Sequence, residues 1–252
     1  MTVRPSTVRP SRKKRSAATP FRRFWILILF LLGAAAAGGY YGATWPGFYP
    51  KRVTVSGNHI VPTAQILAKA AILPRANLWL QNTHAAVARV EAIPYIRRAR
   101  ITRRPPAEVA IVVSEREPFA NVERAGQTLL VDRALRVLET RARPDLPLFA
   151  LARGPAVAPG SFLRDARVRR FRDDYEALLA GHVIAKRLQF DRFEDLVATL
   201  AGGKKILFGD DGDLSKKIPL VNPILAQLSR SVRPVAVVDL RAPGTPIVVY
   251  GR

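Results

Sequence analysis

The chain has 252 residues, with 41 lysines and arginines against 19 acidic residues, a net charge of +22 and no cysteine. A hydrophobic fraction of 48% argues against a disordered polyelectrolyte, and the length fits one large domain or two modest ones. The lack of cysteine excludes a disulfide framework, thiol catalysis and cysteine-ligated zinc or iron–sulfur sites.

The charge is concentrated at the start of the chain. Residues 1–23 carry eight basic residues and no acid, which predicts a disordered basic tail. Residues 24–45 follow without a charge and, at about 1.5 Å per residue, are long enough to cross a hydrocarbon core of about 30 Å. Trp25 and Trp45 stand near the two ends of this stretch, where an aromatic belt belongs. The pattern predicts a single transmembrane helix with its basic end in the cytoplasm and the rest of the chain outside.

A cleaved signal peptide is the main competing interpretation. The strongly apolar part, Phe24–Leu32, is only nine residues long, and Ala34–Ala37 resembles a small-residue cleavage site. The 23-residue basic leader and the uncharged run that continues to Tyr49 favour the anchor.

The first exported module is predicted over residues 48–118. The alternating stretch Arg52–Ser56 indicates a strand that Gly57-Asn58 ends. Two short helices follow, the first capped by Thr63, and then two strands. The predicted order is strand 52–56, helix 64–71, helix 83–89, strand 95–103 and strand 108–115. This order predicts an α+β module with both helices on one face of a three-stranded sheet.

The second module is predicted over residues 119–252 as a mostly antiparallel β domain with flanking helices. Apolar residues at a 3.6 period predict a helix over 161–180, and Asp213 is placed as the cap of a second helix that reaches about residue 231. Strands are expected at 128–132, 136–139, 185–190, 196–200, 204–208, 235–240 and 245–250.

The ordered run VTVSGN, ANLWLQ, IPYIRRARITRRPPAEVAIVVSEREPFA, LLVDRALRV, DLPLF, KKILFGD and VVDLRAPG resembles bacterial division proteins of the FtsQ/DivIB type. The resemblance covers residues 24–252 and includes a POTRA module. It implies a non-enzymatic divisome scaffold in the inner membrane, recruited to the division septum. It also implies periplasmic domains that bind the small bitopic proteins FtsB and FtsL and other divisome proteins, and that help to regulate septal peptidoglycan synthesis. Of the family's terminal Asp-Leu-Arg-Tyr, this chain matches Asp239, Leu240 and Arg241 and has Ala242 in place of the tyrosine.

The last strand is a candidate partner-binding site on physical grounds. Pro246–Tyr250 is apolar and β-prone, so an unpaired edge there would accept an incoming strand. We expect Ile247, Val249 and Tyr250 to contact the partner and Arg241 to pair with an acidic residue. The alternative is that Ile247 and Val249 are ordinary core residues.

A second candidate is a basic surface on the first module, formed by Arg97, Arg98, Arg100, Arg103 and Arg104. Five cations in eight residues indicate an acidic protein partner or anionic lipid headgroups. The alternative, which we favour, is a solvated strand face on which the arginine stems cover the sheet edge.

The sequence lacks the motifs that are typical of other function classes. There is no GxSxG, HExxH or GxxxxGK, and the three histidines have no metal-binding spacing, so no enzyme activity, cofactor or metal is expected. The segment 209–213 lacks the register of a calcium loop, and the acidic clusters at 173–176 and 191–195 lie among arginines, as surface ion pairs do. A nucleic-acid binder is not favoured, because the clearest free cations are the topogenic leader. A POTRA-bearing transport or chaperone component that handles exported polypeptides is the alternative function.

Overall fold

The structure is a computed structural model, and it describes residues 19–151, 154–229 and 235–251. Residues 1–18 of the predicted basic tail lie outside this range. The chain divides into two compact units: one contains residues up to 52 with Leu73–Gln81 and Arg103–Val109, and the other contains the rest. The boundary expected between residues 118 and 119 separates the two modules predicted from the sequence, and it does not coincide with the division into these two units. It stays a prediction.

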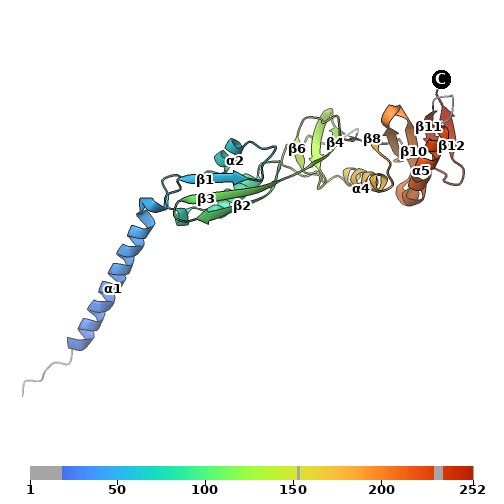
Figure 1. Cartoon of the computed structure of the whole chain (residues 1–252). Helices are drawn as coiled ribbons and strands as arrows, with labels where there is room; N and C mark the ends of the chain where they lie inside the picture. Colours follow the sequence, from blue (N-terminus) through green and yellow to red (C-terminus); the bar gives the residue numbers. More distant parts are fainter. Residues whose placement is uncertain (1–18, 152–153, 230–234, 252) are drawn as a thin grey trace, which may run out of the picture. The chain divides into compact units, whose positions relative to one another are not determined.

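The described part of the chain starts with a long apolar helix, α1, which runs from Thr19 to Thr44 (Figure 1). Its segment Arg22–Thr44 is apolar and long enough to cross a membrane, and none of it is buried against the protein. A core helix of a soluble domain would be covered on at least one face, so this exposure favours a surrounding that is itself apolar.

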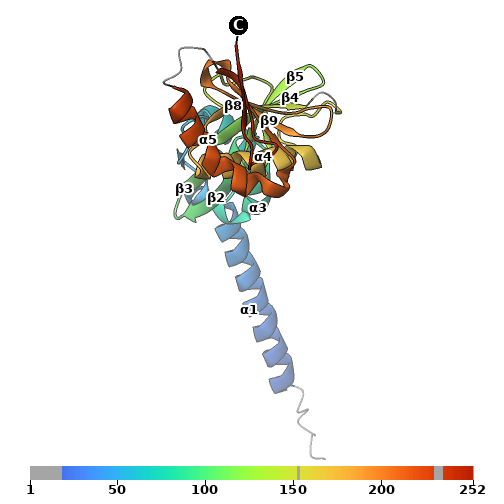
Figure 2. The ribbon, with the colours of Figure 1, turned by 90° about the vertical axis from the view of Figure 1, so that its right-hand side faces the viewer.

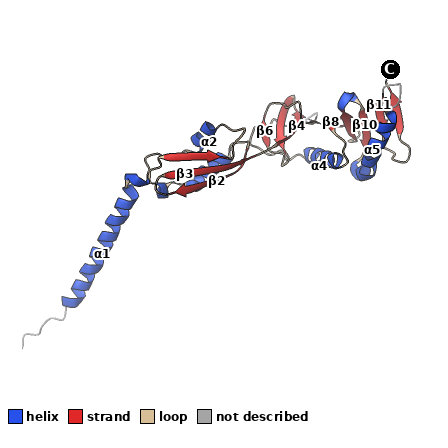
Figure 3. Cartoon of the chain, viewed as in Figure 1, coloured by secondary structure: helices blue, strands red, loops and turns tan. Residues whose placement is uncertain are grey.

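The next 70 residues form a small α+β domain with strands β1 to β3 in the order β1-β3-β2 (Figure 1; strands are red in Figure 3). Its elements are β1 Arg52–Ser56, α2 Thr63–Ala70, α3 Thr83–Glu91, β2 Ile96–Arg104 and β3 Glu108–Glu115. The predicted order of strand, two helices and two strands is confirmed. One detail was wrong: Thr63 is the first helical residue of α2, and Pro62 holds the cap position without a side-chain bond. The side chain of Asn82 caps α3 by accepting from the N–H of Ala85.

Strand β2 contains an irregular step. Ile96 and Ala99 are both buried, although strict alternation places residues three apart on opposite faces. The two arginines between them, Arg97 and Arg98, are both exposed. Because Ile96 and Ala99 do not fit one uninterrupted strand, the alternation is reset between them.

The end of β3 holds the loop that follows β1. The carboxylate of Glu115 accepts hydrogen bonds from three successive backbone N–H groups, those of His59 (2.9 Å), Ile60 (2.8 Å) and Val61 (2.8 Å). Burial acts to raise the pKa of Glu115, but the three N–H donors outweigh it and hold the pKa below the ordinary value of 4.5.

We expect Glu115→Gln to destabilise the protein by about 1–2 kcal/mol near neutral pH, because a neutral amide satisfies these donors less well. A group whose pKa is depressed by folding stabilises the fold above its unfolded pKa, and this contribution disappears as the pH falls through the folded pKa. The difference in thermal midpoint between wild type and variant should therefore be constant from neutral to mildly acidic pH and shrink below 4.5. Glu117→Gln, at an exposed neighbouring carboxylate, is the control. An undiminished difference in strong acid would contradict this role of the charge.

The remainder of the chain forms a nine-stranded mixed sheet in the order β12-β11-β10-β9-β8-β7-β4-β5-β6. The strands are β4 Pro118–Arg124, β5 Gln127–Asp132, β6 Val137–Glu139, β7 Leu148–Leu151, β8 Ala185–Phe190, β9 Leu196–Leu200, β10 Lys205–Gly209, β11 Val235–Asp239 and β12 Ile247–Tyr250. Five of the eight strand pairs are antiparallel, so the β-rich, mostly antiparallel domain is confirmed. Strands β4 and β7 were not predicted.

Two helices pack on this sheet: α4 Ala166–Ala180 and α5 Leu214–Leu228 (Figure 2). Their apolar faces share one core with the strands, and in that core Phe149 lies against the rings of Phe119, Phe171 and Tyr175. Helix α5 contains both Pro219 and Pro223 without ending at either.

The predicted start of α4 at residue 161 was wrong. Residues 160–163 instead hydrogen-bond to the backbone beside β6: the N–H of Val137 donates to Ser161 O, and those of Gly160 and Leu163 donate to Val137 O and Leu135 O. The helix begins only after Asp165, whose side chain accepts from the N–H of Arg167.

Candidate partner-binding surface

The two ends of the nine-stranded sheet differ in how their outer edges are used. The edge at β6 is covered by residues 160–163, as described above. At the other end, β12 pairs with β11 on one side only, and within the described ranges no strand lies on its outer side (Figure 1). An edge of this kind presents backbone donors and acceptors to an incoming strand.

Strand β12 directs its apolar side chains to opposite faces. Val248 packs against the core, whereas Ile247 is 60% exposed and Val249 is 50% exposed. Tyr250, at the end of the strand, is 43% exposed. The exposure of Ile247 and Val249 does not fit the alternative that they are ordinary core residues.

The exposed residues of β12 continue two rows that cross four strands. Laterally paired residues project to the same face. One row passes through Val197, Leu207, Asp239 and Ile247, and the other through Thr199, Lys205, Val237 and Val249. A strand added beside β12 would extend both rows.

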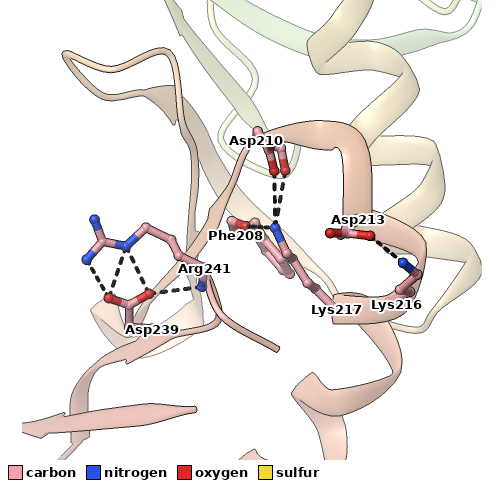
Figure 4. Close-up of polar contacts among 7 residues, drawn as sticks. All are labelled: Phe208, Asp210, Asp213, Lys216, Lys217, Asp239 and Arg241. Carbon is pink, nitrogen blue, oxygen red and sulfur yellow. Dashed lines mark hydrogen bonds and ion pairs between the residues drawn. The ribbon is translucent and has the colours of Figure 1, made fainter. Parts of the chain in front are cut away.

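The motif Asp239-Leu240-Arg241 lies at the end of β11, and its three residues make different contacts. Leu240 is fully buried, and its N–H donates to Leu207 O at 2.8 Å. Asp239 and Arg241 point outward and pair: Arg241 Nε lies 3.0 Å from both carboxylate oxygens, and Nη2 lies 2.6 Å from Oδ2 (Figure 4). The stem of Arg241 lies over Gly209, where an added Cβ would come within 3.1 Å of Arg241 Cγ.

Electrostatics keep this pair ionised. The hydrogen bonds from Arg241 hold the pKa of Asp239 below its ordinary value, and the same contact raises the pKa of Arg241. A shallow hollow of about 330 Å³ lies beside the pair and is lined by Asp239, Arg241, Ala242, Thr245 and Ile247. The residue at position 242 thus faces the hollow with a methyl group, where an aromatic side chain would fill part of it.

A buried lysine fixes α5 to this end of the sheet. Lys217 is 1% exposed, and its Nζ donates to Phe208 O at 2.7 Å and lies 3.4 Å from Asp210 Oδ1 (Figure 4). Sequence reasoning missed this residue. Its spacing from Leu214, Ile218 and Val221 places it on the apolar face of the helix. A lysine at such a position in the sequence pattern could have indicated a buried, partnered charge. Asp213 stands at the predicted cap position, but its side chain bonds Lys216 Nζ and makes no cap bond.

The five arginines of the candidate basic surface have different surroundings. Arg103 donates to the backbone carbonyls of Leu78 and Gln81, and Arg104 lies 3.9 Å from Glu108. Arg97, Arg98 and Arg100 are exposed, and Arg97 also lines a hollow with Glu115 and Asp132. Arg103 therefore has a structural use, and the surface as a whole stays a prediction. In the part of the chain that the structure describes, no group of three or more His, Cys, Asp or Glu residues could hold a metal ion.

Comparison with known proteins agrees with this architecture. Residues 48–116 match the family described as POTRA domain, FtsQ-type. The chain is 25% identical over 197 residues to the cell division protein FtsQ of Neisseria meningitidis serogroup B, an alignment that covers 76% of this chain and 78% of that protein. It is 27% identical over 227 residues to FtsQ of Xanthomonas campestris pv. campestris, which covers 86% of this chain and 76% of the relative. A match to FtsQ of Streptomyces venezuelae is 30% identical over 127 residues, which is 49% of this chain and 46% of that protein.

One apolar N-terminal helix, a POTRA domain and a β-rich C-terminal domain define a POTRA protein with a candidate membrane anchor. The family match over residues 48–116 and the similarity along most of the chain agree: the chain carries an FtsQ-type POTRA domain and is similar to cell division proteins named FtsQ.

Proposed function

We propose that this protein is a non-enzymatic division scaffold, anchored by α1 in the inner membrane with its basic end in the cytoplasm and its two domains in the periplasm. Similarity to cell division proteins named FtsQ supports the role in division. The basic N-terminal flank supports the orientation, because positively charged segments are retained on the cytoplasmic side. No nucleic acid or cofactor takes part in this function.

The open outer edge of β12 is the observation that carries the mechanism. A small bitopic partner of the FtsB or FtsL kind adds a strand beside β12 and forms backbone hydrogen bonds along it. The partner's side chains then cover Ile247, Val249 and Tyr250, which water reaches in the free protein. Burial of this apolar surface stabilises the complex, and the strand register sets its specificity.

Arg241 adds a charged contact at the end of the edge. Its bonds to Asp239 use Nε and Nη2, and the side chain is 51% exposed, so an acidic group of the partner can approach the Nη1 side. The pairing with Asp239 holds the guanidinium in one orientation before the partner arrives, which lowers the entropic cost of binding. Once assembled, the complex helps to recruit and regulate the septal peptidoglycan synthesis machinery.

Imaging tests the proposed function. A fluorescent fusion of the full chain, expressed in cells depleted of their own copy, is expected to gather at mid-cell, restore division and co-purify with FtsB- and FtsL-like proteins. A uniform envelope signal without restored division would contradict the scaffold function and favour a POTRA component for exported polypeptides.

A further inference from the structure

A short turn of the POTRA domain is fastened to the end of the apolar helix. Asn77 is only 3% exposed, and its Nδ2 donates to the backbone carbonyls of Gly42 (2.8 Å) and Ala43 (3.0 Å). These carbonyls belong to the last turn of α1, where no helical N–H remains to pair with them. The contact fixes residue 77 at the level at which α1 ends.

The same turn is also held through its backbone. Arg103 donates from Nε to Leu78 O (2.9 Å) and from Nη2 to Gln81 O (2.6 Å). The N–H of Trp79 donates to Asn77 Oδ1 at 2.8 Å. Residues 77–81 are thus held by several independent bonds, so the side chains they expose have a fixed direction.

The turn exposes two large apolar side chains. Trp79 is 55% exposed and Leu80 is 69% exposed, whereas Leu78 before them is fully buried. Trp45, the first residue after α1, is 59% exposed. Single exposed apolar residues are common on protein surfaces, but a tryptophan and a leucine held beside the end of an apolar helix indicate an apolar or interfacial environment.

The charges near the turn have one predominant sign. The segments of this compact unit that follow α1 are residues 45–52, 73–81 and 103–109, and they contain five basic residues and one acid. Lys51, Arg52, Arg75 and Arg104 are exposed. Basic residues at this level suit anionic lipid headgroups, to which each contributes about 1 kcal/mol of attraction.

We propose that the turn 77–81 is seated in the membrane interface, with Trp79 and Leu80 in the boundary between headgroups and acyl chains of the leaflet where α1 ends. The segment Arg22–Thr44 has 23 residues and a length of about 35 Å, so Gly42 and Ala43 lie at the edge of a hydrocarbon core of about 30 Å. Asn77 therefore places the turn at interfacial depth. The inference rests on the proposed anchoring by α1, and it gives the protein a second contact with the membrane.

Spin labelling of the full chain in liposomes of phosphatidylethanolamine and phosphatidylglycerol tests the inference, because the chain has no native cysteine. Leu80→Cys carries the label at the turn. Leu29→Cys, 65% exposed within α1, reports on the anchor, and Phe193→Cys, 66% exposed on the β-rich domain, reports on a water-exposed apolar site. Accessibility is measured to oxygen, which is enriched in lipid, and to a water-soluble nickel chelate.

The label at residue 80 is expected to lose most of the nickel accessibility seen at residue 193 and to become more accessible to oxygen. Trp79→Glu in the Leu80→Cys chain should restore nickel accessibility, whereas Val112→Glu, on the POTRA sheet, should not. A label at 80 that behaves like the one at 193, while the label at 29 lies in lipid, would overturn the inference and leave the anchor intact. A label at 29 exposed to nickel would overturn the anchor as well. A label at 80 shielded from both reagents would show that protein covers the turn instead, and that also overturns the inference.

Discussion

Replacement of Ile247 and Val249 together by lysine is expected to weaken binding of the partner strand by about 30-fold. Each side chain is about half exposed, so its complete burial by a partner is worth about 1 kcal/mol, half of the value for a fully exposed residue of this size. Loss of both contacts removes about 2 kcal/mol, which corresponds to that change in dissociation constant. Lysines at a strand edge also oppose the addition of another strand.

The same edge can be tested through its backbone. Val249→Pro removes an N–H from β12 and should lower partner recovery in a pull-down with the full chain, and Arg241→Glu should do so through charge reversal beside Asp239. Val112→Lys is the matched control: it also places a lysine at an exposed valine of a strand, but on the central strand β3 of the POTRA sheet. Each variant must keep the thermal unfolding transition of the wild type. Unchanged partner affinity in the folded double-lysine variant would refute the edge-strand mechanism.

The sequence alone was sufficient to predict those helices and strands that have a strong local pattern. Glu108–Glu115 contains an uninterrupted run of apolar, mostly β-branched residues and became β3 with the predicted bounds. Strand β4, PFANVER, was missed because it lacks such a run: Val122 is its only β-branched residue, and Asn121 stands among its buried residues. The burial of Asn121 is possible because its amide donates to the carbonyls of Arg143 and Leu146 more than twenty residues away, and no local pattern records such a contact.

The candidate site was partly predictable for the same reason. The β-prone end of the chain indicated a strand, and the Asp-Leu-Arg motif indicated its neighbour. Whether the outer edge of β12 is open depends on the order of nine strands, in which β11 pairs in parallel with β10 after the intervening α5. That order follows from packing across the whole domain. The pairing of Arg241 with Asp239 likewise depends on the space that Gly209 leaves for the arginine stem.

Asp132→Ala is expected to cause the largest loss of stability of any single change considered, because it leaves Arg116, whose side chain is only 12% exposed, without its ion-pair partner. Asp132 is 6% exposed, its Oδ2 accepts from Arg116 Nη1 at 2.6 Å, and its Oδ1 accepts from the N–H of Arg136 at 2.8 Å. Arg116 directly follows the POTRA strand β3, and Asp132 ends β5, so the ion pair joins the POTRA segment to the β-rich domain. Removal of one partner from a buried ion pair typically costs about 3–5 kcal/mol.

The double variant Arg116→Leu/Asp132→Asn separates the loss of the pair from the exposure of a lone charge. It removes both charges, keeps a side-chain oxygen that can accept from the N–H of Arg136, and should recover most of the stability that Asp132→Ala loses. For a chain of this length, about 3–5 kcal/mol corresponds to a fall of about 10 °C in the thermal midpoint, which can be measured on the full chain in detergent. Because six strands separate β5, which Asp132 ends, from β12 in the sheet, Asp132→Ala should leave partner affinity unchanged at temperatures where the variant is folded. A double variant as unstable as Asp132→Ala would show that the junction depends on the ion pair itself, and not only on the avoidance of an unpaired buried charge.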